Sequence, residues 1–357
     1  MTLTPQAAPA SPDGAARARP DHPAARSQLR RRLLCVALSL VLLLVAVVLA
    51  LAVGAHHLAQ AEIWDALLGR AVAEDVRVVV QMRLARTAVA LVAGAGLAVA
   101  GALVQAVTRN PLADPGILGT TAGAAFAVAM GAGIAGLDGH LGLLAASFVG
   151  AAVATVAVHA IGSLGRNAAS LVQLVLAGTA LGAVLAGITQ AIVLSDTERF
   201  SVMQSWRAGS LADRDWQAIP TALPFLLAGL LVAAAISGSL NAIALGDDLA
   251  ASLGANVALV RSLAVLAVTL LAGTATALAG PIGFVGLMVP HAARRLTGPD
   301  QRWILALCLL LGPALLLLAD VLGRVVMPPG ELPAGIVTAF VGAPVLIWLA
   351  RGRMSEL

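Results

Sequence analysis

The chain has 357 residues, of which 60% are hydrophobic and only 11% are charged. With a mean hydropathy of +0.95, the chain is too apolar for a soluble domain of this length. The composition therefore excludes a water-soluble protein and indicates a polytopic membrane protein. The formal net charge of +4 arises from few charged residues, all of the basic ones arginine, and indicates no nucleic-acid partner. The two cysteines, Cys35 and Cys308, lie in separate apolar runs, which predicts neither a disulfide nor a metal pair.

The first 29 residues are rich in alanine, proline and arginine and have no apolar period, which predicts a disordered tail. An uncharged run follows from Leu33 to Ala61. This run is longer than the roughly 7 to 15 apolar residues of a signal peptide. We therefore interpret it as a first membrane span, with Arg30, Arg31 and Arg32 on the cytoplasmic side. Residues 30–357 then form one transmembrane domain.

A membrane-spanning helix needs about 20 apolar residues, with a lower limit of roughly 17. Nine uncharged runs meet this limit. They cover residues 33–61, 87–108, 115–137, 139–165, 167–195, 216–246, 262–293, 303–319 and 332–350.

The run over residues 262–293 is too long for one span, because as a single helix it would extend about 48 Å against a hydrocarbon core of about 30 Å. It also contains Gly280, Pro281, Gly283 and Gly286, and these residue types interrupt helices. We expect a long helix and a short helix, joined by a break that lies near a transport path. A plain turn between ordinary helices is the alternative. The division gives ten spans with both termini on one side, where most arginines then lie.

Glycines recur at spacings typical of close helix packing in lipid. They are Gly94, Gly96 and Gly101 in the second run, Gly119 and Gly123 in the third, and Gly178 and Gly182 in the fifth. Ordinary packing of a glycine- and alanine-rich bundle explains most of them.

A polar octet from Arg109 to Gly116 separates the second and third runs on the cytoplasmic side. Its prolines, Pro111 and Pro115, fix φ and restrict the residues before them. The octet therefore predicts a rigid loop that continues neither helix.

The sixth run is followed by a polar stretch in which Leu245, Leu249 and Leu253 recur every four residues. Asp247 and Asp248 lie between the leucines, and glycines stand at both ends. This pattern predicts a short amphipathic helix on the cytoplasmic face. Adjacent acidic residues would be repelled by an anionic leaflet, so the pattern favours a protein partner that accepts the helix in a groove.

Arg83 and Arg86 come just before the second run, and Arg324 lies near the outer end of the ninth span. Arginines on the outer side run against the positive-inside rule and suggest an acidic partner. The alternative for Arg324 is a helical i, i+4 pair with Asp320. For Arg83 and Arg86 the alternative is anchoring at the membrane interface.

From about Arg83 to Arg351 the chain resembles the FecCD family of ABC-transporter permeases, which import iron-siderophore complexes, haem and vitamin B12. The motifs that carry the resemblance follow one another in order along the chain. They are Arg83 to Arg86, Asn110 to Gly116, Leu245 to Gly254, Gly280 to Gly286, Val289 to His291, Leu318 to Asp320, Glu331 to Pro333 and Gly342 to Pro344.

The resemblance implies an all-α polytopic protein with about ten transmembrane helices and the type II ABC importer permease fold. It implies a place in the bacterial plasma (inner) membrane, with both termini cytoplasmic. The implied partners are a second permease, identical or related, two cytoplasmic ATPase subunits and an extracytoplasmic substrate-binding protein. Membrane lipid surrounds the assembly, and no nucleic acid is involved.

The resemblance also implies roles for individual residues. The coupling helix that sits in the ATPase matches Leu245, Gly246, Asp247, Asp248, Leu249, Ser252, Leu253 and Gly254. The arginines that meet glutamates of the binding protein match Arg83, Arg86 and Arg324, and the cytoplasmic gate matches Asn110 and Leu112. Ala85 stands where the family usually has proline, which predicts a looser docking turn. The other gate loop, around Gly162 to Ser170, has no distinctive pattern, and no gate residue is assigned there.

The chain has no phosphate-binding glycine loop, so we expect ATP to be bound elsewhere. As a permease subunit, the chain is expected to hold no catalytic residue, metal or cofactor of its own. ATP and Mg²⁺ are expected on the partner ATPase, whose closure would move the loop around Asp247 and switch the gates. A haem or vitamin B12 importer is the alternative to an iron-siderophore importer.

Two other classes compete with an ABC permease. An ion-coupled secondary transporter normally needs ionisable groups at mid-membrane, whereas Asp320 and His159 lie near expected helix ends. A membrane metalloenzyme would depend on His56, His57 and His291, and adjacent histidines of a helix point to different faces.

Overall fold

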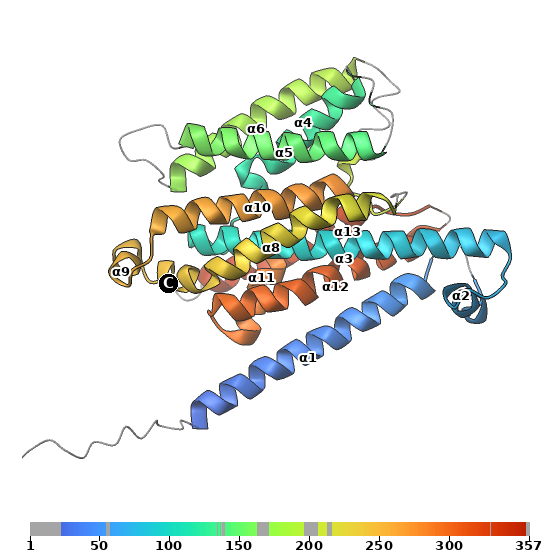
Figure 1. Ribbon diagram of the computed structural model, residues 1–357, viewed down its shortest axis with the longest axis horizontal. Coiled ribbons are helices and arrows are strands. Elements are labelled where there is room, and N and C mark those ends of the chain that lie inside the picture. The colour runs from blue at the N-terminus through green and yellow to red at the C-terminus, as the bar shows by residue number, and fades with distance from the viewer. Residues whose placement is uncertain are drawn as a thin grey trace, which may run out of the picture.

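The computed structural model describes residues 23–54, 58–133, 135, 137, 140–162, 171–195, 206–212, 216–328 and 330–354 (Figure 1). The regular elements of these residues are helical. They are α1 (Pro23–Ala52), α2 (Gln60–Leu67), α3 (Glu74–Thr108), the 3-10 helix η1 (Pro115–Leu118), α4 (Thr120–Gly133), α5 (His140–Gly162), α6 (Leu171–Leu194), α8 (Ala218–Ile243), α9 (Asp247–Ser252), α10 (Val257–Ala279), α11 (Val285–Thr297), α12 (Gln301–Val326) and α13 (Ala334–Met354).

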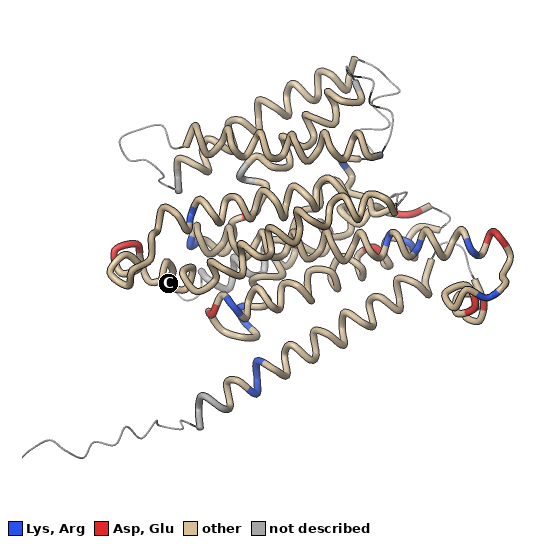
Figure 2. Tube along the Cα trace, viewed as in Figure 1, with Lys and Arg blue, Asp and Glu red and all other residues tan. Residues whose placement is uncertain are grey.

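Seven of the described helices are long and apolar enough to cross a membrane, namely α1, α3, α5, α6, α8, α10 and α12. Helices α4 and α13 contain shorter apolar segments, Thr120–Ala132 and Ala334–Ile347. With α11, which follows the break after α10, these helices occupy the ten positions that the sequence predicts. Charged residues gather towards the two ends of the bundle, and its middle is almost free of them in the described part (Figure 2).

Helix α3 forms the centre of the bundle and packs against α8, α10, α11 and α12, while α4, α5 and α6 form a group on one side (Figure 1). The close approach depends on glycine. A Cβ atom on Gly94 would lie 2.6 Å from the backbone nitrogen of Pro313 in α12, and one on Gly101 would overlap the backbone of Gly286 in α11. The second-run glycines therefore lie at helix crossings, as the sequence predicts.

The predicted break over residues 280–286 is confirmed, because α10 ends at Ala279 and α11 begins at Val285. Gly280 and Phe284 adopt positive φ values of 74° and 69°, so the chain cannot continue as a helix through them. The segment packs against the loop that precedes α8, and a Cβ atom on Gly280 would lie 2.5 Å from the carbonyl oxygen of Trp206. It is a packed junction between two bundle helices.

A buried side chain binds a backbone carbonyl that the short helix α11 leaves open. Pro290 lies inside α11 and cannot donate to the carbonyl of Gly286. The Gln105 amide of α3 donates to the carbonyl oxygens of Gly286 and Leu287, at 3.4 and 3.2 Å. The Gln105 carbonyl oxygen in turn accepts from Arg294 at 3.4 Å. An interrupted helix is thus compatible with the membrane because protein groups replace its missing bonds.

Several predicted boundaries are wrong. Helix α1 begins at Pro23, so residues 23–29 are helical rather than part of a disordered tail, while residues 1–22 lie outside the described residues. It ends at Ala52 instead of Ala61, and the separate helix α2 follows. Helix α4 begins at Thr120 instead of residue 115 because Asp114 accepts a hydrogen bond from the Gly116 amide at 2.8 Å and starts η1.

Candidate functional site

Two groups of polar residues lie at opposite ends of the bundle. The α9 end holds α9 and the loop from Arg109 to Gly119, and the arginine end holds Arg83, Arg86 and Arg324. The sequence predicts function at both ends.

The short helix predicted between Leu245 and Gly254 is present as α9, six residues long. Gly246 and Gly254 flank it with φ values of 123° and 85°, which are readily adopted only by glycine. The connection therefore reverses direction sharply on both sides of α9. As a result α9 projects from the end of the bundle between α8 and α10 (Figure 1).

One face of α9 is apolar and open. Leu245, Leu249 and Leu253 are 64%, 49% and 65% exposed, whereas Ala250 on the opposite face is fully buried against the bundle. Leu249 lies in α9, Leu253 is its C-cap and Leu245 comes just before its N-cap, Gly246. The three exposed leucines therefore form a surface on and beside a projecting helix that a protein groove can cover. Asp248 and Ser252 lie in the same helix, and the Ser252 hydroxyl donates to the Leu249 carbonyl oxygen at 2.8 Å.

The octet predicted as a rigid loop is held by its own side chains. Asn110 accepts a hydrogen bond from the Leu112 amide at 3.0 Å through its side-chain oxygen, and Asp114 does the same for Gly116. Both residues that the sequence places at the gate, Asn110 and Leu112, are exposed, Leu112 to 49%. Two Asx turns and two prolines leave this loop few ways to deform.

A cluster of ion pairs joins this loop to α9. The Asp247 carboxylate is paired with the Arg109 guanidinium and with Arg261 of α10, the latter at 2.8 Å. Arg109 also donates from Nε to the carbonyl oxygen of Ile243, the last residue of α8, at 2.9 Å. The sequence does not predict that Arg109 and Asp247 meet.

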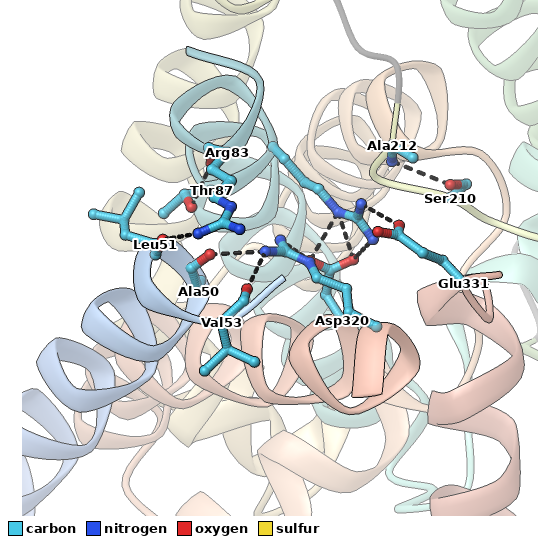
Figure 3. A network of polar contacts seen from close by, with 11 residues as sticks. Ala50, Leu51, Val53, Arg83, Thr87, Ser210, Ala212, Asp320 and Glu331 are labelled. Carbon is cyan, nitrogen blue, oxygen red and sulfur yellow. Dashed lines mark hydrogen bonds and ion pairs between the residues drawn. The ribbon is translucent and has the colours of Figure 1, made fainter. Parts of the chain in front are cut away.

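At the arginine end, Arg83 and Arg324 bind backbone carbonyls at the end of α1. Figure 3 labels Arg83 and three of the residues that supply these carbonyls, Ala50, Leu51 and Val53. Arg83 donates to the carbonyl oxygens of Leu51 and Ala52 at 2.8 and 3.2 Å. Arg324 donates to those of Ala50 and Val53 at 2.7 and 3.0 Å. These carbonyls have no partner within a helix, and the end of a helix carries partial negative charge. The two guanidinium groups therefore cap α1.

Carboxylates complete the arginine end (Figure 3). The fully buried Asp320 pairs with Arg86 at 2.6 Å and with Arg324, four residues further along α12. The i, i+4 pair proposed for Arg324 is therefore present. Arg86 also contacts Glu331, in the connection between α12 and α13, at 2.5 Å. In the sequence Glu331 stands out only as part of a motif, and its pairing with Arg86 is not predicted.

Arg83 and Arg86 come before the uncharged run that begins at residue 87, and they lie inside α3, which begins at Glu74. The helix of the second run therefore starts earlier than the run itself. Helix α3 can carry these two charges because each of them meets a carboxylate or a carbonyl group. Ala85 is a buried residue of the same helix, so the looser docking turn expected there is absent.

The three arginines differ in their exposure. Arg83 and Arg324 are only 5% and 2% exposed. The side chain of Arg86 is 12% exposed, and that of its partner Glu331 is 31% exposed. Solvent therefore reaches the cluster mainly at the Arg86–Glu331 pair.

Some predicted features fall outside the described residues. His56 and His57 do, as does most of the loop from Gly162 to Ser170. Among the residues that are described, no group of three or more histidine, cysteine or acidic residues could hold a metal ion.

Known proteins are similar to this chain over most of its length. The profile of the FecCD transport family matches residues 42–352. The ferric enterobactin transport system permease protein FepD of Escherichia coli K12 is 46% identical over 315 residues, which cover 88% of this chain and 94% of FepD. The Fe(3+) dicitrate transport system permease proteins FecC and FecD of the same organism are 39% and 37% identical, over 76% and 80% of this chain and 82% and 89% of their own lengths.

A solved structure extends the similarity to the fold. It is described as an inward-facing conformation of a metal-chelate type ABC transporter, and it matches with a TM-score of 0.78 and 27% identity over 89% of this chain and 98% of that chain. The arrangement of helices and the sequence therefore agree. Since the family profile covers most of its length, the chain belongs to the FecCD transport family.

Proposed function

We propose that this chain is a permease subunit of an ATP-binding-cassette importer and forms part of the path that carries ferric siderophore complexes across the bacterial plasma membrane. The match to the FecCD family over residues 42–352 carries the proposal. The relatives support the substrate class, since FepD is named for ferric enterobactin and FecC and FecD for ferric dicitrate. In this arrangement the α9 end and both termini face the cytoplasm, and the arginine end faces outward.

The leucine face of α9 is the proposed contact with a cytoplasmic ATPase, which binds ATP and Mg²⁺. Its support is the exposure of Leu249 in α9, which projects from the bundle, and of Leu245 and Leu253 beside it. The test replaces residues 245–254 with a Gly/Ser linker and measures whether the purified ATPase subunit still co-purifies. Loss of the ATPase is expected. Retention would reject the coupling role of α9.

A matched control separates this effect from damage to the bundle. Leu231 of α8 is 71% exposed and lies in the apolar middle of a membrane-spanning helix. Leu231→Ala should leave the ATPase bound, whereas the double variant Leu249→Ala/Leu253→Ala should weaken its binding. Equal effects of the two changes would indicate a general loss of folding.

The arginine end is the proposed docking site for an acidic extracytoplasmic binding protein. Arg86 is the side chain that such a partner reaches first, because its pair with Glu331 is partly exposed. Arg83 and Arg324 are buried next to Arg86 and stabilise the site by donating hydrogen bonds to the end of α1. Charge reversal at each of the three positions should weaken docking, more at low salt than at high salt. Unchanged affinity in all three variants would reject the docking role.

The second permease of the importer is proposed to be a related chain rather than a copy of this one. The support is that FecC and FecD, both similar to this chain, are named as permeases of one transport system. To test the assignment, this chain is co-expressed with a related permease and with a second copy of itself that carries a different tag. Pull-down of the related chain but not of a second copy is expected, and the reverse would establish a homodimer.

A further inference from the structure

At the α9 end, the side chain of Arg109 holds two elements at once. Its guanidinium pairs with Asp247, the first residue of α9, and its Nε donates to the carbonyl of Ile243, the last residue of α8. The backbone of Arg109 is the C-cap of α3 and leads directly into Asn110. One residue therefore connects the end of the central helix with the base of the projecting one.

The backbone of Arg109 adopts a conformation that is uncommon for residues with a long side chain. Its φ of 48° lies in the left-handed region, which glycine or asparagine usually occupies at the end of a helix. A side chain of another type is held there at a conformational cost.

We propose that Arg109 is the positioning residue that carries movement of α9 to the gate loop from Asn110 to Gly116. The inference rests on the proposed function, because it assigns a path for the motion that an ATPase would impose on α9. Helices α8 and α10 follow α9 through the covalent chain. Helix α3 is distant from α9 in sequence. Its link to α9 is the side chain of Arg109, which pairs with Asp247.

The gate loop is built to move as one body once Arg109 moves. Asn110 is the next residue, and its side chain fixes the Leu112 amide at 3.0 Å. Asp114 fixes the Gly116 amide at 2.8 Å, and prolines occupy positions 111 and 115. A displacement of Arg109 thus shifts Asn110 and Leu112 together, instead of being absorbed by bending between them.

The exposure of the pair suits a role in motion better than one in stability. The side chains of Arg109 and Asp247 are 41% and 42% exposed, and ion pairs that are so accessible to water add little to folding stability. Variants at these positions should therefore fold. This separates the proposed role from a structural one.

The experiment uses the complete complex of permeases, ATPase and binding protein, reconstituted in proteoliposomes with a ferric siderophore. Two quantities are measured for each variant, ATP hydrolysed and siderophore taken up, together with the amount of ATPase that co-purifies. Arg109→Gln should retain the ATPase and hydrolyse ATP but take up about tenfold less siderophore for each ATP, and Asp247→Asn should lower the same ratio. The control Arg70→Gln, which breaks an exposed Arg–Asp pair beside α2, should keep the wild-type ratio.

A double-mutant cycle shows whether the two residues act through one connection. If they do, the variant Arg109→Gln/Asp247→Asn should be no worse than either single change. Additive losses, or a wild-type ratio in Arg109→Gln, would overturn the inference. So would a loss in Arg261→Gln without one in Arg109→Gln, because Asp247 would then act through α10. Failure of the wild-type complex to use ATP would instead reject the proposed function.

Discussion

Arg86 of α3 and Asp320 of α12 form an ion pair of 2.6 Å inside the bundle, although 234 residues separate them in the sequence. The same carboxylate also holds Arg324, which caps the end of α1. Asp320 is therefore the residue through which α1, α3 and α12 are tied together at the arginine end.

Removal of the Asp320 charge should destabilise the protein strongly. The Asp320→Asn variant leaves the buried guanidinium group of Arg324 and the partly buried one of Arg86 without their shared carboxylate, and breaking a buried ion pair costs about 3 to 5 kcal/mol. Thermal unfolding of the detergent-solubilised subunit measures this loss. Glu331→Gln is the matched control, since Glu331 is partly exposed and Arg86 keeps Asp320. Equal melting temperatures for the two variants would contradict the central role of Asp320.

The crossing of α3 and α11 should not tolerate even one added methyl group. Gly101→Ala places its Cβ in the backbone of Gly286, and overpacking of this kind costs about 1 to 3 kcal/mol. A Cβ atom on Gly187 of α6, by contrast, would have no neighbouring atom within 4 Å. Gly187→Ala should therefore be neutral or stabilise the helix by about 0.5 to 1 kcal/mol. Similar stability of both variants in unfolding measurements would show that the crossing can relax.

Gln105→Leu should weaken the junction between α3 and α11. The variant leaves the carbonyls of Gly286 and Leu287 without the amide that binds them. A buried acceptor that loses its partner costs about 1 to 3 kcal/mol. Gln81 is exposed on the same helix, and Gln81→Leu should change stability by less than about 0.5 kcal/mol. The difference in unfolding midpoint between these variants is the measurement, and its absence would contradict the capping role of Gln105.

Stability should depend on pH through Asp114. Burial raises the pKa of its carboxyl group above the ordinary value of 3.8, and the hydrogen bond from the Gly116 amide opposes part of this shift. The folded state then holds a proton that the unfolded state has released, so stability falls as pH rises from the ordinary pKa to the folded one. Asp114→Asn keeps a hydrogen-bond acceptor but cannot ionise. The wild type should lose stability relative to this variant as pH rises through that window, and parallel curves would contradict the prediction.

The sequence predicts the elements that depend on apolar length or on strong helix breakers. The break at Gly280 and Pro281 follows from an uncharged run that is too long for one span. Helix α9 is predicted by leucines spaced four residues apart, with glycines close to both ends of the stretch. Both signals are local, and they need no knowledge of the neighbouring helices.

The sequence does not predict features that depend on contacts between distant segments. A search for uncharged runs stops at Arg86, whereas α3 continues back to Glu74 because its arginines meet Asp320, Glu331 and the end of α1. The sequence does not predict the burial of Arg83 and Arg324 either, because it depends on their contacts with the end of α1. The Arg109–Asp247 pair joins residues 138 positions apart, and only the fold brings them together.

The energy source of transport tests the central claim most directly. The reconstituted complex of this permease with its partner permease, ATPase and binding protein should accumulate ferric siderophore when ATP is supplied on the ATPase side. Collapse of the proton gradient should leave that uptake unchanged. Uptake that persists without ATP and stops when the proton gradient is collapsed would contradict the claim and identify an ion-coupled transporter.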